Sequence, residues 1–282
     1  MAKGRCLCGA LNYELDGPFV AMIHCHCSMC RKHHGTYFAT FVAGPIKGFR
    51  WNSGEDRLMR YQSSPKGART FCGVCGTAGP STIPEHGLAI APAASLEGDL
   101  GIKPQSHIFV GSAAPWDAIT DALPQHEVYP PGFGGEGVAR PVVTPRAGIT
   151  EGSCLCGDIA YEITGAPVRA MNCHCGRCRL GRAAAHATNV FYKLDQFRWV
   201  RGESLVREYK LPDARFHTAA FCAKCGGKVP RPSPDRGVVI VPAGSLDTDP
   251  GMRAQANVFV ADKAPWFEIT GPTPQFPEMP TQ

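Results

Sequence analysis

A pattern of seven cysteines occurs twice in this chain of 282 residues and uses all 14 of its cysteines. The first copy is Cys6, Cys8, Cys25, Cys27, Cys30, Cys72 and Cys75. The second copy is Cys154, Cys156, Cys173, Cys175, Cys178, Cys222 and Cys225. The first five cysteines of the second copy lie 148 positions after their counterparts, and the last two lie 150 positions after them. Each half of the chain is therefore organised around the same set of thiols.

Matches outside the cysteines indicate that a whole domain is repeated. The matching pairs are Gly4–Gly9 with Gly152–Gly157, Phe49–Trp51 with Phe197–Trp199, Phe71–Gly76 with Phe221–Gly226, and Ala114–Trp116 with Ala264–Trp266. A chain of 282 residues is also longer than one hydrophobic core usually serves. We predict a tandem duplication with domains at 1–128 and 149–282, and at most two inserted residues between Tyr209 and Phe221.

The segment 129–148 between the two copies is rich in proline and glycine. These residues suit neither a helix nor a central strand, so we expect an extended linker or strap. A shorter tail of the same kind follows the second copy at 271–277. Because the segment and the tail follow equivalent parts of the two copies, we infer that they have the same origin. We therefore expect the first strap to lie along its own domain.

Short apolar segments bounded by glycine, proline or serine predict β-strands in both halves. They are rich in branched or aromatic side chains and include 38–42, 87–91, 107–110 and 237–241. Helical periodicity is not sustained beyond a turn or two anywhere in the chain. The predicted fold class is all-β, with two tandem small antiparallel β domains that carry the cysteine motifs on their turns.

Composition restricts the class of protein. The chain has no apolar run long enough to span a bilayer and no basic-then-apolar leader at its start, so we expect a soluble, cytoplasmic protein. In that reducing compartment, 14 thiols indicate metal binding or catalysis rather than disulfides. The formal charge of +5 is spread thinly, which argues against a nucleic-acid footprint.

The outer cysteines of each copy have the spacing of a closed zinc site. A Cys-x-x-Cys turn followed by glycine presents two thiolates to one tetrahedral ion, and a Cys-x-Cys segment can supply two more. The predicted ligand sets are Cys6, Cys8, Cys72 and Cys75 in the first copy, and Cys154, Cys156, Cys222 and Cys225 in the second. Such a centre ties the two ends of each repeat together and contributes to folding free energy.

The inner cysteines form a different kind of site, with three thiols within six residues. These triads are Cys25, Cys27 and Cys30, and Cys173, Cys175 and Cys178. Three thiolates leave a zinc ion with about one net negative charge and an open fourth position, which suits one further thiolate. We predict that this position takes a small-molecule thiol and holds it deprotonated, ready to add to a carbonyl carbon. The whole chain would then hold four zinc ions, two per repeat.

The neighbours of the inner triads leave two alternatives open. A nearby histidine could close the fourth position and make the inner site structural, with His24 and the His33-His34 pair as candidates. His26 and His174 lie between ligands, where successive side chains diverge, so we expect either a surface position or a supporting role behind the ligands rather than ligation. Arg31 and Arg179 are candidates either for pairing with a substrate carboxylate or for solvated charges on a turn.

Taken together, these motifs resemble the glutathione-dependent formaldehyde-activating enzyme family, which also includes centromere protein V. The resemblance rests on Gly-x-Cys-x-Cys-Gly, Cys-His-Cys-x-x-Cys-Arg, Phe-Cys-x-x-Cys-Gly and the Ala-Pro-Trp tail, and covers nearly all of both repeats. It implies a β-tent fold with one structural and one catalytic zinc per domain. It also implies a carbon–sulfur lyase-type reaction that joins glutathione to formaldehyde, and a tandem chain whose two repeats pair with each other.

The two copies differ beside the inner triads. The second copy has Asn172 where the first has His24, and Asn257 where the first has His107. No cysteine ligand is missing from either copy, so which copy turns over substrate is open. The alternative function is a non-catalytic zinc module for binding protein or nucleic acid, against which the scattered charge counts.

Overall fold

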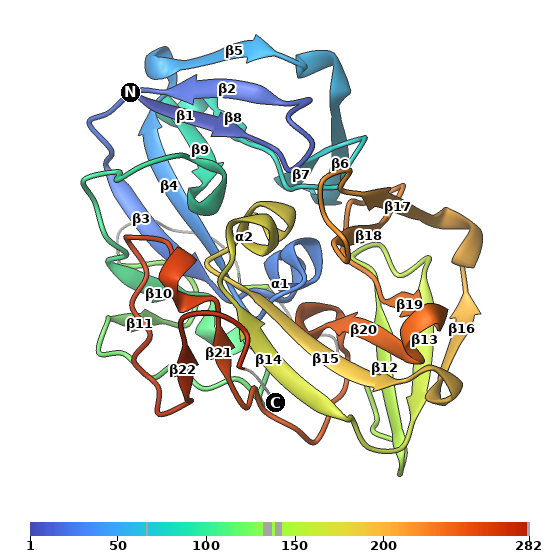
Figure 1. The fold of residues 1–282 in the computed structure, drawn as a ribbon. Helices are drawn as coiled ribbons and strands as arrows, with labels where there is room; N and C mark the ends of the chain where they lie inside the picture. Colours follow the sequence, from blue (N-terminus) through green and yellow to red (C-terminus); the bar gives the residue numbers. More distant parts are fainter. Residues whose placement is uncertain (66, 132–136, 139–142, 281–282) are drawn as a thin grey trace.

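The computed structural model describes residues 1–65, 67–131, 137–138 and 143–280, and most of the ordered structure in them is β-sheet (Figure 1). Each half contributes a three-stranded sheet, a six-stranded sheet, a two-stranded hairpin and one short α-helix. The predicted all-β fold class is confirmed. Within the described residues, no helix is long and apolar enough to cross a membrane.

In the first half, the small sheet has the order β1-β2-β5 and the large sheet the order β11-β10-β3-β4-β9-β8. Pairing is antiparallel, except that β10 runs parallel to both β3 and β11. The strands are β1 (Ala2–Arg5), β2 (Asn12–Leu15), β3 (Ala21–Cys25), β4 (Ala39–Pro45), β5 (Phe49–Ser53), β6 (Leu58–Ser64), β7 (Gly67–Cys72), β8 (Ser81–Ile83), β9 (Leu88–Pro92), β10 (Ser106–Ile108) and β11 (Gln125–His126). Helix α1 (Ser28–His34) follows β3, and β6 pairs with β7.

The second half repeats this topology, with sheet orders β12-β13-β16 and β19-β20-β15-β14-β21-β22. Its strands are β12 (Ile149–Ser153), β13 (Ala160–Thr164), β14 (Arg169–Cys173), β15 (Ala187–Lys193), β16 (Phe197–Arg201), β17 (Val206–Lys210), β18 (Thr218–Cys222), β19 (Arg231–Ser233), β20 (Val238–Pro242), β21 (Asn257–Val258) and β22 (Gln275–Phe276). Helix α2 (Gly176–Arg182) follows β14. Short 3-10 helices lie at Ile46–Gly48, Glu55–Arg57, Pro84–His86, Ala93–Ser95, Val110–Ser112, Leu194–Gln196, Glu203–Leu205, Pro234–Arg236, Ala243–Ser245 and Val260–Asp262.

One buried tyrosine anchors the small sheet of each half in the same way. The hydroxyl of Tyr13 lies 2.6 Å from Ser95 Oγ, and that of Tyr161 lies 2.6 Å from Ser245 Oγ. Both rings are almost fully buried, so these hydrogen bonds satisfy hydroxyls that cannot reach water. A Cβ atom at Gly4 would collide with the Tyr13 ring, which is why a residue without a side chain stands on the neighbouring strand.

The two halves pack closely, and each helix lies against the other half. Helix α1 contacts the 3-10 helix Ala243–Ser245, where a Cβ at Gly244 would collide with the backbone of Arg31 and Thr36. Tyr61 of the β6–β7 hairpin packs against the outer cysteines of the second half, and Tyr209 packs against those of the first. These reciprocal contacts are compatible with the predicted pairing of the repeats.

Part of the predicted linker lies beside the first half. Val138 of this segment packs against the cluster that contains the first inner triad, as does Val128, the last residue of the predicted first domain. Residues 132–136 and 139–142 of the predicted 129–148 linker lie outside the described residues. The domain limits 1–128 and 149–282 therefore stay predictions.

A buried ion pair joins the two halves. Lys32 Nζ of α1 lies 2.6 Å from Asp247 Oδ1, and it also donates to the carbonyl and the hydroxyl of Ser153 at 2.9 and 2.8 Å. The Ser153 hydroxyl donates to Asp247 Oδ2 at 2.6 Å. Among the described residues, the oxygens that bind the ammonium thus all come from the second half. The counterpart of Lys32 in the second copy is Leu180, so the interaction occurs once.

We predict that Asp247→Ala lowers the free energy of unfolding by roughly 3 kcal/mol, because it leaves the Lys32 ammonium buried without its carboxylate. The control is Glu268→Ala, which removes the exposed ion pair with Lys103 between the same two halves. That change should cost less than about 1 kcal/mol. Urea denaturation followed by circular dichroism measures both, and equal losses would contradict a central role for the buried pair.

Candidate metal centres

The structure collects the cysteines into four groups, within each of which the sulfur atoms lie within 4.8 Å of one another. Two groups contain four residues: Cys6, Cys8, Cys72 and Cys75, and Cys154, Cys156, Cys222 and Cys225. Two contain three residues: Cys25, Cys27 and Cys30, and Cys173, Cys175 and Cys178. All of them are free thiols. The role of these residues as metal ligands and in catalysis stays a prediction.

The outer groups have the spacing that a tetrahedral zinc ion needs. Zinc with sulfur ligands at about 2.3 Å places neighbouring sulfurs about 3.8 Å apart. Cys8 Sγ lies 3.4 Å from Cys6 Sγ and 3.7 Å from Cys72 Sγ. The backbone amide of Leu11 donates to Cys6 Sγ at 3.2 Å, a contact that favours the thiolate. The donor set therefore fits zinc, and it fills all four positions of such an ion.

Secondary structure explains how distant segments meet at an outer group. Cys6 and Cys8 follow β1, whereas Cys72 ends β7 and Cys75 lies in the turn after it. The turn closes through Gly76, whose φ of 71° lies in the left-handed region that glycine adopts without strain. The second half repeats the geometry, with 3.4 Å from Cys154 Sγ to Cys156 Sγ.

Each inner triad lies where a strand passes into a helix. Cys25 ends β3, Cys27 caps the N-terminus of α1, and Cys30 lies in its first turn. The amide of Cys30 donates to Cys27 Sγ at 3.3 Å, and Cys25 Sγ lies 3.6 Å from Cys27 Sγ. Cys173, Cys175 and Cys178 have the same placement around β14 and α2. The short connection between strand and helix thus brings the three sulfur atoms of each triad close together.

Hydrogen bonding among the thiols selects one sulfur of each triad for deprotonation. The Cys25 and Cys30 thiols donate to Cys27, which holds the pKa of Cys27 well below its usual value. In the second triad the same contacts from Cys173 and Cys178 lower the pKa of Cys175 to about 2. The sulfur at each helix N-terminus thus accepts hydrogen bonds from its two neighbours, which favours its thiolate form.

Among the described residues, the groups of potential metal ligands contain no histidine. The histidines proposed as a fourth ligand make hydrogen bonds with other groups. His24 Nδ1 lies 2.8 Å from Thr40 Oγ1, and His33 Nε2 lies 3.1 Å from the Thr70 carbonyl. His34 Nδ1 lies 2.9 and 3.0 Å from the carbonyls of Arg182 and Ala183. The alternative in which histidine closes the inner site thus receives no support from the geometry.

The histidine between the inner ligands has a different partner in each half. His26 Nε2 lies 2.8 Å from His107 Nδ1, and His107 Nε2 lies 2.9 Å from Asp121 Oδ1. In the second half, His174 Nε2 lies 3.0 Å from the Asn257 side-chain oxygen. Both histidines are buried, so a surface position is wrong. Both arrangements hold the imidazole ring in place beside the cysteines, which fits a supporting role.

Of the two arginines that follow the inner motifs, one is buried and the other donates a hydrogen bond to the backbone. Arg31 is buried, so its interpretation as a solvated charge on a turn is wrong. The position lies inside α1, whose contact with the second half removes it from water. Arg179 Nε donates to the His174 carbonyl at 3.2 Å. Pairing of either arginine with a substrate carboxylate stays a prediction.

The sequence analysis missed Arg69, whose guanidinium reaches the first inner triad from β7. Arg69 Nη2 lies 3.5 Å from Cys30 Sγ and 4.0 Å from Cys27 Sγ. No spacing rule connects this residue to a motif 39 positions away in the sequence. Alignment of the two copies would have flagged it, because the position holds Ala219 in the second.

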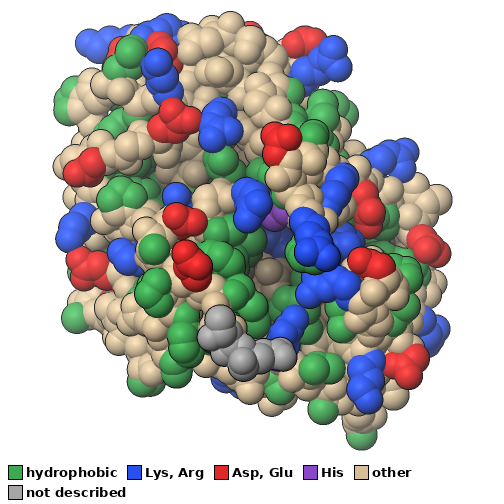
Figure 2. Space-filling view, in the orientation of Figure 1, with side chains coloured by type: hydrophobic (Ala, Val, Ile, Leu, Met, Phe, Trp, Pro, Cys, Tyr) green, Lys and Arg blue, Asp and Glu red, His purple; other side chains and the backbone are tan. Residues whose placement is uncertain are grey.

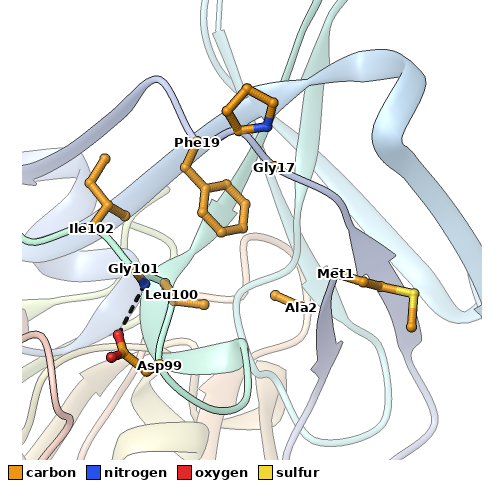
Figure 3. Close-up of a pocket in the computed structure, with 9 residues that line it drawn as sticks. Met1, Ala2, Gly17, Phe19, Asp99, Leu100, Gly101 and Ile102 are labelled. Atoms are coloured by element: carbon orange, nitrogen blue, oxygen red, sulfur yellow. Dashed lines mark hydrogen bonds between the residues drawn. The ribbon is translucent and has the colours of Figure 1, made fainter.

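Two cavities lie among the described residues. One, of about 360 Å³, is lined by the N-terminus and apolar side chains such as Phe19, Leu100 and Ile102 (Figure 3). The other, of about 440 Å³, lies between α1 and the second outer group, with Ser28 and Met29 beside the first inner triad and Cys154 and Cys156 of the second half in its wall.

A family model supplies the comparison that decides the family. The model of the glutathione-dependent formaldehyde-activating enzyme matches residues 1–112 and again residues 149–262. The chain belongs to this family. The prediction of a tandem, two-domain member is thereby confirmed, and the four cysteine groups lie within the matched segments.

Comparisons with individual proteins add little to this. No curated protein matches the chain. A crystal structure of a Rhodobacter sphaeroides protein is similar at 23% sequence identity, with a TM-score of 0.28, over 36% of this chain and 92% of that one.

We expect loss of an outer cysteine to harm folding more than loss of an inner one. Cys72→Ser or Cys222→Ser removes a ligand from the group that ties the ends of a repeat together, so the variant should be largely unfolded or insoluble. Cys27→Ser or Cys175→Ser should leave a folded protein that binds zinc more weakly. Circular dichroism and metal analysis test this, and equal unfolding of both pairs would count against two kinds of site.

Proposed function

We propose that this protein is a zinc-dependent carbon–sulfur lyase that adds a small glutathione-like thiol to formaldehyde or a related aldehyde, or runs the reverse reaction. Membership of the family supports this chemistry in outline. The observation that carries the proposal is the inner triads, in which three sulfurs meet with no fourth protein ligand among the described residues. A closed structural site would need that fourth ligand.

The chain would hold four zinc ions, two in each repeat. The outer groups supply four sulfurs each and would bind structural zinc, whereas each inner triad supplies three sulfurs and would leave one position for the substrate. A zinc ion bound there would stabilise a substrate sulfur as its thiolate near neutral pH. The reaction forms a sulfur–carbon bond between thiol and carbonyl carbon, and the thiol proton ends on the carbonyl oxygen.

Basic side chains beside the second triad suit a thiol that carries carboxylates. Figure 2 shows lysine and arginine side chains gathered around a hollow between α2 and the region of β18 and β19. The positive charge of Arg177 contributes to the low pKa of Cys175. His217 lies close enough to Arg177 and Arg231 that their charges lower its pKa, after the larger effect of desolvation. Glutathione carries two carboxylates that such guanidinium groups could bind.

The state of the cysteines also bears on the cellular location of the protein. All 14 cysteines are free, which suits a reducing compartment and supports a cytoplasmic location.

A non-catalytic zinc module would share the metal sites but would need no exchangeable ligand at the inner triads. Response of the inner sites to a thiol therefore separates the two functions.

The test is cobalt substitution followed by addition of glutathione. Four metal ions per chain are expected by elemental analysis, and chelation should remove those of the inner triads first because they have three protein ligands. Glutathione should strengthen the sulfur-to-cobalt charge-transfer band and saturate, and Cys27→Ser and Cys175→Ser should each remove part of this change. An unchanged spectrum at millimolar thiol would refute an open position. Thiol binding without faster formaldehyde consumption would refute the reaction.

A further inference from the structure

A single arginine distinguishes the two inner triads. Arg69 Nη2 makes contacts of 3.5 Å and 4.0 Å with two of the sulfurs of the first triad. Arg69 Nε is buried and, among the described residues, has no hydrogen-bond partner. A buried donor without a partner costs free energy unless a ligand meets it. The guanidinium therefore already contacts the thiols and keeps one further donor for an anion beside them.

The equivalent position of the second half carries no charge. Arg69 pairs with Tyr61 across the β6–β7 hairpin, and Ala219 pairs with Tyr209 across the β17–β18 hairpin. The two positions are thus equivalent in the fold as well as in the sequence. The charge of Arg182 does act on Cys178, but its guanidinium donates to Asn189 Oδ1 at 3.0 Å. Within the described residues, only the first triad has an arginine hydrogen-bonded to sulfur.

The triads also differ in their access to water. The exposed fractions of Cys25, Cys27 and Cys30 are 5%, 2% and 2%, and those of Cys173 and Cys175 are 9% and 7%. Cys178 is more exposed than any of these. Because less water screens the first triad, the charge of Arg69 acts more strongly there than it would at a surface.

We propose that Arg69 makes the two inner sites unequal, acting as a permanent counter-ion that lets the first site bind a thiolate substrate more tightly than the second. This inference rests on the proposed function, in which each triad binds zinc and a thiol. Three thiolates and a zinc ion carry about one negative charge, and a fourth thiolate adds another. A guanidinium that contacts the sulfurs offsets part of that charge, so the effect on thiol affinity should be about 10- to 100-fold.

The experiment titrates the full-length, cobalt-substituted protein with glutathione and follows the charge-transfer band. The wild-type protein should respond in two phases whose half-saturating concentrations differ by about 10- to 100-fold. Arg69→Gln should weaken the tighter phase until the two merge, and Arg69→Lys should retain part of the difference because it keeps the charge. Arg60→Gln is the matched control, since it removes an exposed arginine from the neighbouring strand β6.

A second readout needs no substrate. With a chelator in excess, Arg69→Gln should speed the release of one zinc ion per chain about 10-fold, because the counter-ion also stabilises the three thiolates. Ala219→Arg should slow release from the second triad. If the Arg69 variants fail to fold, the Ala219→Arg variant still tests the role of the arginine. Unchanged release from its second triad would then overturn that role.

The outcomes separate this inference from the function on which it rests. A glutathione response that is equal in wild type and Arg69→Gln would overturn the role of Arg69 and leave the thiol site intact. Loss of affinity in Arg60→Gln as large as that in Arg69→Gln would also overturn it, because general surface charge would then be responsible. No response to glutathione at either site in wild type would refute the proposed function itself.

Discussion

The meeting of cysteine sulfurs at four points is the constraint on which the rest of this structure depends. Sulfurs within 4.8 Å of one another cannot all ionise without a cation, since like charges at that separation repel strongly in a poorly hydrated interior. A bound metal ion would neutralise this repulsion, and its binding free energy would add to the stability of the fold. The strand ends and tight turns serve this purpose: Cys72 ends β7, Cys25 ends β3, and Cys27 begins α1.

The packing of the two halves protects these sulfur groups. Tyr61 and Tyr209 each cover the outer group of the opposite half, so neither outer group is fully enclosed by its own domain. Lys32 adds a directional contact, because its ammonium is bound by oxygens of Ser153 and Asp247 of the second half. Separating the two halves would remove the tyrosine contacts and would leave Lys32 without its partner Asp247. The duplication therefore supplies an internal interface as well as a second set of sites.

Duplication has also allowed the two inner sites to diverge. The first is nearly closed to water, contacts Arg69, and lies beside a chain of His26, His107 and Asp121. The second is more exposed and has an asparagine and an alanine at the equivalent positions. The three cysteines are the same in both, so the two sites differ in the charge around the sulfur atoms and in their access to water. One chain can in this way present the same metal chemistry in two electrostatic environments.

The sequence alone determined the duplication, the all-β class, the family and the division of the cysteines into sets of four and three. These inferences rest on sequence patterns, because ligands two or three residues apart must share a turn and repeated motifs keep their offsets. Only the tertiary structure decided which side chains surround those sulfurs. Arg69 reaches Cys30 across 39 positions, and Lys32 meets Asp247 from the other half. Arg31 was expected as a possible surface charge and is buried because α1 packs against the second half. Such contacts depend on how sheets and domains pack, and local spacing contains no information about that.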